Sequence, residues 1–301
     1  MTNKIVITGE SGFVGKNLSK YLIDNSFETE FLSLRNLNWK VNTSANVLIH
    51  LAGKAHDVKR TLNASEYFKV NTDLTKELFD AFLDSEIQDF IYFSSVKAVA
   101  DEVENILLES APADPKTPYG QSKLKAEEYI LSKEIPNTKR VFIIRPCMIH
   151  GPGNKGNLNL LFNVVKKGIP YPLASFHNER SFLGIDNLNF LIKEVIENKQ
   201  VPSGIYNFSD DEVLSTNDVV RIISSVLNKK NKLIAVPKGL INSISKVGDL
   251  VKLPLNSETI QKLTENYRVS NKKIKAAIGI EKLPNTARQG LENTIKSFIE
   301  K

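Results

Sequence analysis

The stretch of residues 4–18 constrains the fold more than any other part of the chain, because it combines a strand, a glycine-rich turn and the start of a helix. Residues 5–7 form an apolar run of β-branched side chains, which is typical of a buried parallel strand. Three glycines follow at three-residue spacing, and residues 17–23 then show the apolar periodicity of an amphipathic helix. We therefore expect an α/β fold built on a parallel sheet.

The three glycines of this turn meet different steric needs. Gly9 permits a tight turn, Gly12 lets the backbone approach a ligand, and Gly15 allows the helix to pack closely on the strand. Backbone N–H groups and a helix N-terminus then point at one place, where they can hold a pyrophosphate. The alternative is a glycine-rich turn that binds nothing, because the motif by itself is moderate evidence.

Composition agrees with a globular chain in a reducing cytoplasm. Of the 301 residues, 41% are hydrophobic and 25% are charged, which is enough for a large core. A single cysteine, Cys147, excludes an internal disulfide and gives no metal-ligand cluster. We expect no signal peptide and no stable membrane insertion, because the chain begins directly with a strand and lacks a run of about 18 apolar residues.

The net charge of +6 suits an anionic ligand such as a nucleotide diphosphate. The lysines are scattered along the sequence, and no dense basic stripe with interleaved aromatic residues is present. Nucleic acid is therefore not expected as a partner.

A second strand is predicted for residues 28–34, and its end bears on the choice of cofactor. In NAD-binding sheets an acidic residue about 20 residues past the glycines holds the ribose 2′-hydroxyl. This chain has Ser33 and Arg35 at that place, and a hydroxyl with a cation suits a 2′-phosphate better. We expect NADP in preference to NAD, and the alternative is that Arg35 is a solvated loop residue.

A further strand and helix follow. Residues 47–53 form a buried strand that ends in small residues, which leave room for a cofactor over the sheet. His50 in this strand is expected to be a core residue. Residues 64–83 have helical apolar spacing, and Asn71 lies mid-helix, where asparagine is a poor helix former. This inconsistency indicates a role for the Asn71 side chain.

The next strand and helix supply the predicted catalytic residues. Strand 90–95 ends in two hydroxyls, and Tyr119 and Lys123 lie one turn apart on the helix that follows. Ser95, Tyr119 and Lys123 are thus suited to hydride transfer at a carbinol or carbonyl carbon. We expect the Lys123 ammonium to lower the pKa of Tyr119, the proton donor and acceptor. The same Tyr-Lys spacing recurs from Tyr129 on another helix face, and we interpret Tyr129 as a packing or surface residue.

After residue 150 the alternation of strands and helices becomes irregular, which indicates a second lobe. We expect residues 1–150 to form a dinucleotide-binding domain, with returning segments near 180–226, and residues 151–301 to form mainly a substrate-binding lobe. The predicted helices are 157–167, 186–198, 216–227, 240–251, 257–267 and 288–299, and the predicted strands are 140–146, 203–208 and 233–236.

Several motifs together resemble the extended short-chain dehydrogenase/reductases. They lie at residues 8–15, 50–53, 70–71, 94–95, 118–123, 145–146, 151–153, 179–188 and 204–208. The resemblance covers nearly the whole chain. It implies a Rossmann-like doubly wound parallel sheet with a smaller C-terminal α/β substrate lobe, NADP or NAD as cofactor, and a nucleotide-sugar substrate. It also implies a homodimer formed through the helices at residues 71–83 and 119–133.

The resemblance and the motif positions give the expected binding residues. The cofactor would contact Thr8, Gly9, Ser11, Gly12, Phe13, Val14, Gly15, Arg35, Leu51, Ala52, Gly53, Asn71, Ser94, Tyr119, Lys123 and Pro146. The substrate would contact Lys54, Ser95, Lys97, Lys155, Asn157 and Arg180. Arginine suits the diphosphate because its guanidinium makes bidentate contacts.

Two short stretches bear on the reaction. The 4,6-dehydratases of this family place an Asp-Glu pair after the catalytic hydroxyl residue, whereas Val96 and Lys97 follow Ser95 here. The 4-epimerases usually carry an asparagine shortly after the arginine that corresponds to Arg145, whereas residues 146–148 are Pro-Cys-Met here. The Ser-Ser-Val-Lys stretch resembles that of nucleotide-sugar 4-ketoreductases.

These features favour an NAD(P)H-dependent reductase of a UDP-4-keto-6-deoxy-N-acetylhexosamine, acting in the synthesis of surface-polysaccharide precursors. One alternative is a UDP-hexose or UDP-N-acetylhexosamine 4-epimerase with tightly bound NAD. Another is a non-catalytic dinucleotide-binding regulatory protein.

Overall fold

The structure, a computed structural model, describes residues 4–35, 38–41, 44–54, 63–154, 156–251 and 256–300. Its centre is a six-stranded sheet in which every pair of neighbours is parallel. The strands, in spatial order, are β2 (Glu28–Leu32), β1 (Lys4–Thr8), β3 (Val47–His50), β4 (Asp89–Phe93), β6 (Arg140–Pro146) and β9 (Gly204–Phe208). The chain moves outward from β1 to β2 and then crosses to β3, so the strand order reverses beside β1. Ligands of doubly wound sheets bind at such a reversal, at the carboxyl ends of the strands.

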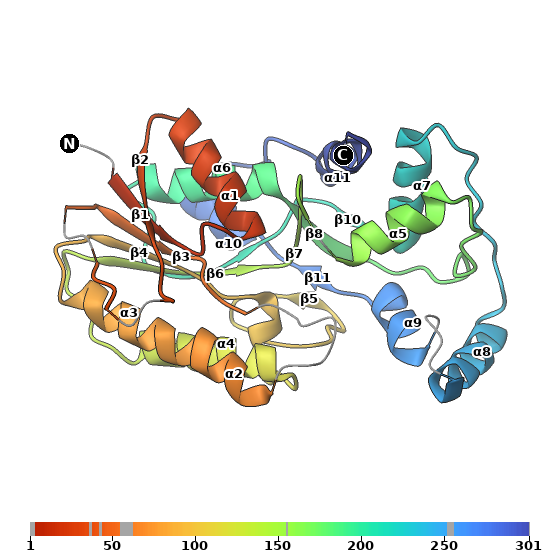
Figure 1. Ribbon diagram of the computed structural model, residues 1–301, viewed down its shortest axis with the longest axis horizontal. Helices are drawn as coiled ribbons and strands as arrows, with labels where there is room; N and C mark the ends of the chain where they lie inside the picture. Colours follow the sequence, from red (N-terminus) through yellow and green to blue (C-terminus); the bar gives the residue numbers. More distant parts are fainter. Residues whose placement is uncertain are drawn as a thin grey trace.

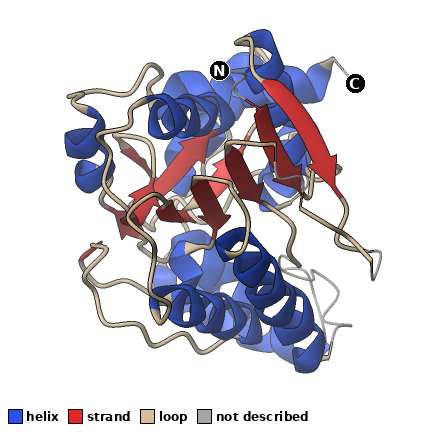
Figure 2. Cartoon of the chain, turned by 90° about the vertical axis from the view of Figure 1, so that its left-hand side faces the viewer, coloured by secondary structure: helices blue, strands red, loops and turns tan. Residues whose placement is uncertain are grey.

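Helices cover both faces of this sheet (Figures 1 and 2). One face carries α1 (Phe13–Asp24), α6 (Ile185–Glu197) and α10 (Lys272–Ile278), and the other carries α2 (Ala64–Phe68), α3 (Leu74–Leu83) and α4 (Pro118–Leu131). A core of buried aliphatic and aromatic side chains lies on each side of the strands. Burial on both faces explains why the inner strands β1, β3, β4 and β6 read as continuous apolar runs rather than as alternating patterns.

A second lobe lies beyond the carboxyl ends of the central strands (Figure 1). It contains a three-stranded sheet in the order β10 (Val213–Leu214), β8 (Arg180–Gly184) and β7 (Met148–His150). Its helices are α5 (Asn157–Lys166), α7 (Thr216–Val226), α8 (Lys238–Val251), α9 (Ser257–Thr264) and α11 (Ala287–Ile299). A small parallel pair, β5 (Ile106–Leu107) and β11 (Arg268–Val269), lies between the two lobes. The lobe has its own apolar core, formed largely by α5, α7 and α11.

Most predicted elements are confirmed, and the predicted return of strand 203–208 is seen as the pairing of β9 with β6. Helix α7 begins at Thr216 because Ser215 and Asp218 form a reciprocal capping box. The predicted strand 233–236 is wrong: it makes only isolated bridges to Tyr171 and Leu173. Its partner there is an irregular segment after α5, which cannot sustain a ladder.

Some boundaries differ from the predictions. β2 ends at Leu32, so Ser33 and Arg35 lie after the strand, and α9 ends at Thr264 rather than at Tyr267. Helix α10 and the short strands β5, β7, β8, β10 and β11 were not predicted, because such short segments carry little periodicity. Among the described residues, no helix combines the length and the apolar character needed to cross a bilayer.

Candidate active site

The glycine turn has the shape of a backbone cradle. Gly9 has a φ of +75°, and a Cβ on it would lie 2.6 Å from the Ala52 nitrogen. A Cβ on Gly15 would lie 2.4 Å from the Gly9 carbonyl oxygen, so the first turn of α1 packs directly on the turn backbone. Gly12 precedes α1, and its N–H donates to the Gly9 carbonyl at 3.0 Å. Side chains are thus excluded where the helix N-terminus opens, and this cradle fits a dinucleotide pyrophosphate.

Side chains behind the cradle hold β1 and β3 in register. The Thr8 hydroxyl is hydrogen-bonded to His50 Nδ1 at 2.7 Å and accepts from the Ala52 N–H at 3.2 Å. His50 Nε2 is hydrogen-bonded to Thr75 at 2.9 Å, and burial, together with the nearby Lys123 charge, lowers the pKa of His50 to about 3. His50 is therefore a neutral core residue, as predicted.

Asn71 has the specific role that its mid-helix position indicated. It lies in a π-helical segment, Lys69–Asp73, between α2 and α3, and it is fully buried. Its side chain accepts from the Lys54 N–H at 2.8 Å and donates to the Lys54 carbonyl at 3.0 Å and to the Ser122 hydroxyl at 3.0 Å. Asn71 thus fixes the loop after β3 against α4, beside the expected cofactor path.

The three predicted catalytic side chains converge at the carboxyl end of β4. Ser95 caps a short 3-10 helix, Val96–Ala98, and its hydroxyl is hydrogen-bonded to Tyr119. Tyr119 lies in the first turn of α4, which begins at Pro118 with Thr117 as its cap. Lys123 Nζ, one turn further, donates to the Phe93 carbonyl at 2.7 Å.

The predicted lowering of the Tyr119 pKa by Lys123 is wrong for this structure. Burial raises the pKa of Tyr119 above its ordinary value, and the hydrogen bond from Ser95 offsets this only in part. The Lys123 ammonium is bonded to the Phe93 carbonyl, and burial lowers the pKa of Lys123 itself to about 8. In this arrangement Ser95, rather than Lys123, is the group that favours the Tyr119 phenolate.

A buried charge network under the catalytic helix was missed by sequence reasoning. Arg145 at the end of β6 donates from Nε to both carboxylate oxygens of Glu127, at 3.0 and 3.1 Å, and from Nη1 to the Glu109 carbonyl at 3.3 Å. The Ser94 hydroxyl, which was expected to contact the cofactor, donates to Glu127 in this structure. Glu127 lies one turn past Lys123 and raises its pKa against burial. The same-face spacing of Tyr119, Lys123 and Glu127 was the available signal.

A cleft of about 1050 Å³ opens over Ser95 and Tyr119, between the main sheet and the second lobe. Among the predicted substrate residues, Ser95, Lys97, Asn157 and Arg180 line it. Polar, charged and sulfur-containing lining residues that were not predicted are Asp101, Glu102, Asp114, Lys116, Thr117, Cys147, Met148, Ser181, Gln261, Glu265 and Tyr267.

Two cations of the cleft are held by partners within it. Arg180 forms an ion pair with Glu265 at 3.4 Å. Lys97 Nζ lies 4.3 Å from the centre of the Tyr267 ring and donates to the Asp101 carbonyl at 2.6 Å. The Tyr267 hydroxyl in turn donates to the Ala100 carbonyl at 2.7 Å, so β11 and the loop after β4 are tied together.

The remaining predicted residues lie as follows. Ser11, Gly12, Arg35 and Gly53 are exposed, Phe13, Val14, Leu51, Ala52 and Lys54 are half-buried, and Pro146 is buried. Lys54 does not line the cleft, and its ammonium is paired with Glu66 on α2. Lys155 lies outside the described residues.

Comparison with known proteins agrees with this geometry. Residues 5–208 match the model of the NAD dependent epimerase/dehydratase family. The chain belongs to this family.

Relatives of the chain act on sugars. It is 30% identical to the UDP-glucose 4-epimerase of Vibrio cholerae, over 100% of the chain and 97% of the relative. It is 26% identical to the N-acetyl-alpha-D-glucosaminyl-diphospho-ditrans,octacis-undecaprenol 4-epimerase of Escherichia coli O157:H7, over 98% of the chain and 95% of the relative.

Among solved structures, the fold resembles that of RMD from Pseudomonas aeruginosa complexed with NADPH. The TM-score is 0.76, the identity is 20%, and both chains are covered completely. As a member of the NAD dependent epimerase/dehydratase family, the protein is an NAD(P)-dependent enzyme of the extended short-chain dehydrogenase/reductase type with a Rossmann-like sheet.

Proposed function

We propose that the protein is a 4-epimerase of a UDP-activated hexose or N-acetylhexosamine. The observation that carries this proposal is the hydrogen-bonded pair of Ser95 and Tyr119 on the floor of a large cleft. The two relatives described above, each of which spans nearly the whole chain, are both 4-epimerases. These similarities favour epimerisation over the 4-ketoreduction expected from the sequence.

The proposed chemistry is a transient oxidation at the sugar C4 atom. Bound NAD would supply the hydride acceptor and the returning hydride. Tyr119 takes the proton of the C4 hydroxyl as the C4–H bond breaks, and it returns this proton to the oxygen when a hydride re-forms a C4–H bond on the opposite face. Ser95 holds the same oxygen through its hydroxyl. Inversion requires the keto sugar to turn over inside the site, and a cleft of about 1050 Å³ provides room.

The second candidate is the 4-ketoreductase, which two observations favour. Cys147 and Met148 line the cleft where the 4-epimerases of the family usually carry an asparagine. Arg35 is exposed just past β2, where a 2′-phosphate of NADPH would be recognised.

Identification of the bound cofactor and assay of turnover together test the proposal. The purified protein is denatured and any released dinucleotide is identified by mass spectrometry. In parallel, UDP-glucose and UDP-N-acetylglucosamine are incubated with the protein without added cofactor and followed by proton NMR. Near-stoichiometric NAD and formation of the C4 epimer support the epimerase. An empty protein that oxidises NADPH only with a 4-keto sugar identifies the reductase, and absence of dinucleotide binding would contradict both candidate functions.

Tyr119→Phe gives a sharper test of the same site. Loss of the phenolic oxygen is expected to lower kcat by about 10²- to 10⁴-fold, the usual contribution of a general acid–base group. Tyr129→Phe is the matched control, because Tyr129 repeats the spacing to a lysine but donates to Asp80 at 2.6 Å, outside the cleft. Near-normal turnover of Tyr119→Phe would contradict the assignment.

A further inference from the structure

One end of the second lobe concentrates the positive charge of the chain. Residues 157–175 and 219–248 contain eight lysines and arginines and no aspartate or glutamate. These 49 residues therefore carry +8, and since the whole chain carries +6, the remainder carries −2. The lysines look scattered along the sequence, but the fold gathers them.

Backbone and side-chain hydrogen bonds hold the two segments side by side. The Tyr171 N–H donates to the Lys232 carbonyl at 2.9 Å, and the Ile234 N–H donates to the Tyr171 carbonyl at 2.9 Å. Lys229 Nζ donates to the Lys166 carbonyl at the end of α5. The segment that joins α7 to α8 therefore runs beside the segment after α5, at one end of the molecule (Figure 1).

Aliphatic side chains project into solvent among these lysines. Ile169, Ile234 and Leu240 are 50%, 48% and 54% exposed. We name this surface the lysine-rich end, and it comprises Lys166, Lys167, Ile169, Lys229, Lys230, Lys232, Ile234, Lys238 and Leu240, all of which are exposed. Cations interspersed with exposed aliphatic groups are the composition of surfaces that lie on anionic bilayers.

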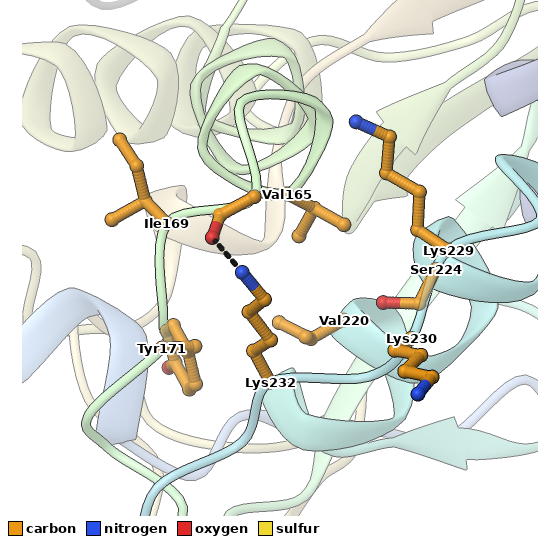
Figure 3. A pocket seen from close by; sticks show the side chains of 9 residues that line it. Val165, Ile169, Tyr171, Val220, Ser224, Lys229, Lys230 and Lys232 are labelled. Atoms are coloured by element: carbon orange, nitrogen blue, oxygen red, sulfur yellow. Dashed lines mark hydrogen bonds between the residues drawn. The ribbon is translucent and has the colours of Figure 1, made fainter.

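A recess of about 190 Å³ opens within this surface (Figure 3). Lys229, Lys230 and Lys232 line it, and Lys232 Nζ reaches the Gly168 carbonyl at 2.9 Å. That bond uses one of three ammonium N–H donors. Ser224 also lines the recess, and its buried hydroxyl has no hydrogen-bond partner in the part of the chain that the structure describes. An uncommitted hydroxyl beside ammonium groups suits a phosphate oxygen.

We propose that the lysine-rich end is a docking surface for an anionic phospholipid bilayer, with one lipid phosphate seated in the recess. The charge complements the headgroups, and the exposed aliphatic side chains reach the acyl boundary. Nucleic acid fits less well, because recognition of single strands uses exposed aromatic rings, and none is among the exposed large hydrophobic residues of this surface. The docking is peripheral and does not depend on the proposed reaction.

Flotation of the full-length protein with vesicles tests the docking surface. The vesicles contain phosphatidylcholine alone or phosphatidylcholine mixed with phosphatidylglycerol, at low and at high salt. We expect binding only to the mixed vesicles, weakened by salt, because lysines near an anionic surface are attracted to its headgroups and salt screens this attraction. Replacing Lys229, Lys230 and Lys232 by glutamine is expected to weaken partitioning by about tenfold or more.

A charge-matched control separates this surface from general attraction. Glutamine replacements of Lys272, Lys282 and Lys296, which are exposed elsewhere, change the net charge equally and are expected to retain binding. Serine replacements of Ile169, Ile234 and Leu240 are expected to reduce binding without changing turnover.

Four outcomes would overturn the proposal. They are absence of binding to mixed vesicles, equal loss in both lysine variants, saturable binding of free inorganic phosphate without vesicle binding, and preferential binding of a single-stranded oligonucleotide. Vesicle binding is measured without turnover, so its failure is distinguishable from failure of the proposed function.

Discussion

Asp210 is a buried carboxyl group just after β9, away from the proposed chemistry. It accepts from the Gly184 N–H at 3.0 Å and from the Asn187 side chain at 2.7 Å, and its Oδ2 lies 3.9 Å from His150 Nε2. Burial raises the pKa of Asp210 to about 7, against the lowering effect of these hydrogen bonds. Burial also lowers the pKa of His150 to about 4, so His150 is neutral beside it at neutral pH. Burial at this site therefore disfavours the charged forms of both Asp210 and His150.

Asp210→Asn is expected to change the pH dependence of stability. Between the unfolded pKa of 3.8 and the folded pKa of about 7, folded protein binds more protons at Asp210 than unfolded chain, so this group makes stability fall as pH rises. The asparagine variant does not titrate and therefore lacks this pH-dependent loss of stability. Its urea midpoint should therefore rise relative to that of the wild type between pH 5 and pH 8.

Asp186→Asn is the control for this prediction, because Asp186 is exposed on the neighbouring helix α6. It should show no such pH-dependent gain. An Asp210→Asn difference that stays constant with pH would show that Asp210 has an ordinary pKa.

At the scale of elements, the junction of β1 with α1 depends on glycine, which has no side chain. A Cβ on Gly15 would lie within 2.7 Å of three backbone atoms of the preceding turn, none of which can rotate away. The first turn of α1 can therefore approach the cradle only when residue 15 is glycine. Position 239, in the first turn of α8, has open space around it.

Gly15→Ala is expected to weaken NADH binding by about tenfold or more, because displacement of α1 misplaces the N–H groups that face the pyrophosphate. The measurement is fluorescence titration of the protein, stripped of nucleotide, with NADH. Gly239→Ala is the matched control and should bind normally. Equal affinities of the two variants would mean that the cradle does not hold the dinucleotide.

How much of the structure could be predicted from the sequence depends on whether the interacting residues are close together along the chain. The strand, turn and helix of residues 4–24 are contiguous, so local spacing was sufficient to predict them. A role for the Asn71 side chain could be predicted because asparagine is unfavourable in the middle of a helix. The pair of Arg145 and Glu127 was missed because its members meet across β6 and α4, and neither residue is unusual in its own segment. Residues 233–236 do not form a strand because their partner, the distant segment that contains Tyr171 and Leu173, makes only isolated bridges with them.

At the scale of the whole molecule, the cleft has one wall on each lobe. Ser95 and Tyr119 come from the sheet side, and Arg180 on β8 and Glu265 after α9 come from the second lobe. Arg180 is about one-fifth exposed, so its guanidinium faces the cleft while it remains paired with Glu265. A substrate that spans the cleft would contact both lobes.

Arg180→Gln is expected to raise the KM for a UDP-sugar by about tenfold or more while changing kcat little. Charge-assisted hydrogen bonds of this kind are worth roughly 1.5–3 kcal/mol, and the diphosphate does not react. Arg268→Gln is the control, because Arg268 pairs with Glu179 nearby but does not line the cleft. A loss confined to kcat would instead place Arg180 at the reacting carbon.

The position of β9 has a consequence for how such a chain can be recombined. β9 completes the central sheet beside β6, yet it is encoded after β7, α5 and β8 of the second lobe. A single genetic crossover near residue 150 would therefore replace β9 and α6 together with the second lobe, so that β6 would have to pair with the strand of the other parent. Exchange of the second lobe between relatives requires at least two separate inserts, one on each side of the stretch that contains α6 and β9. The lobes are distinct in space but interleaved in the gene.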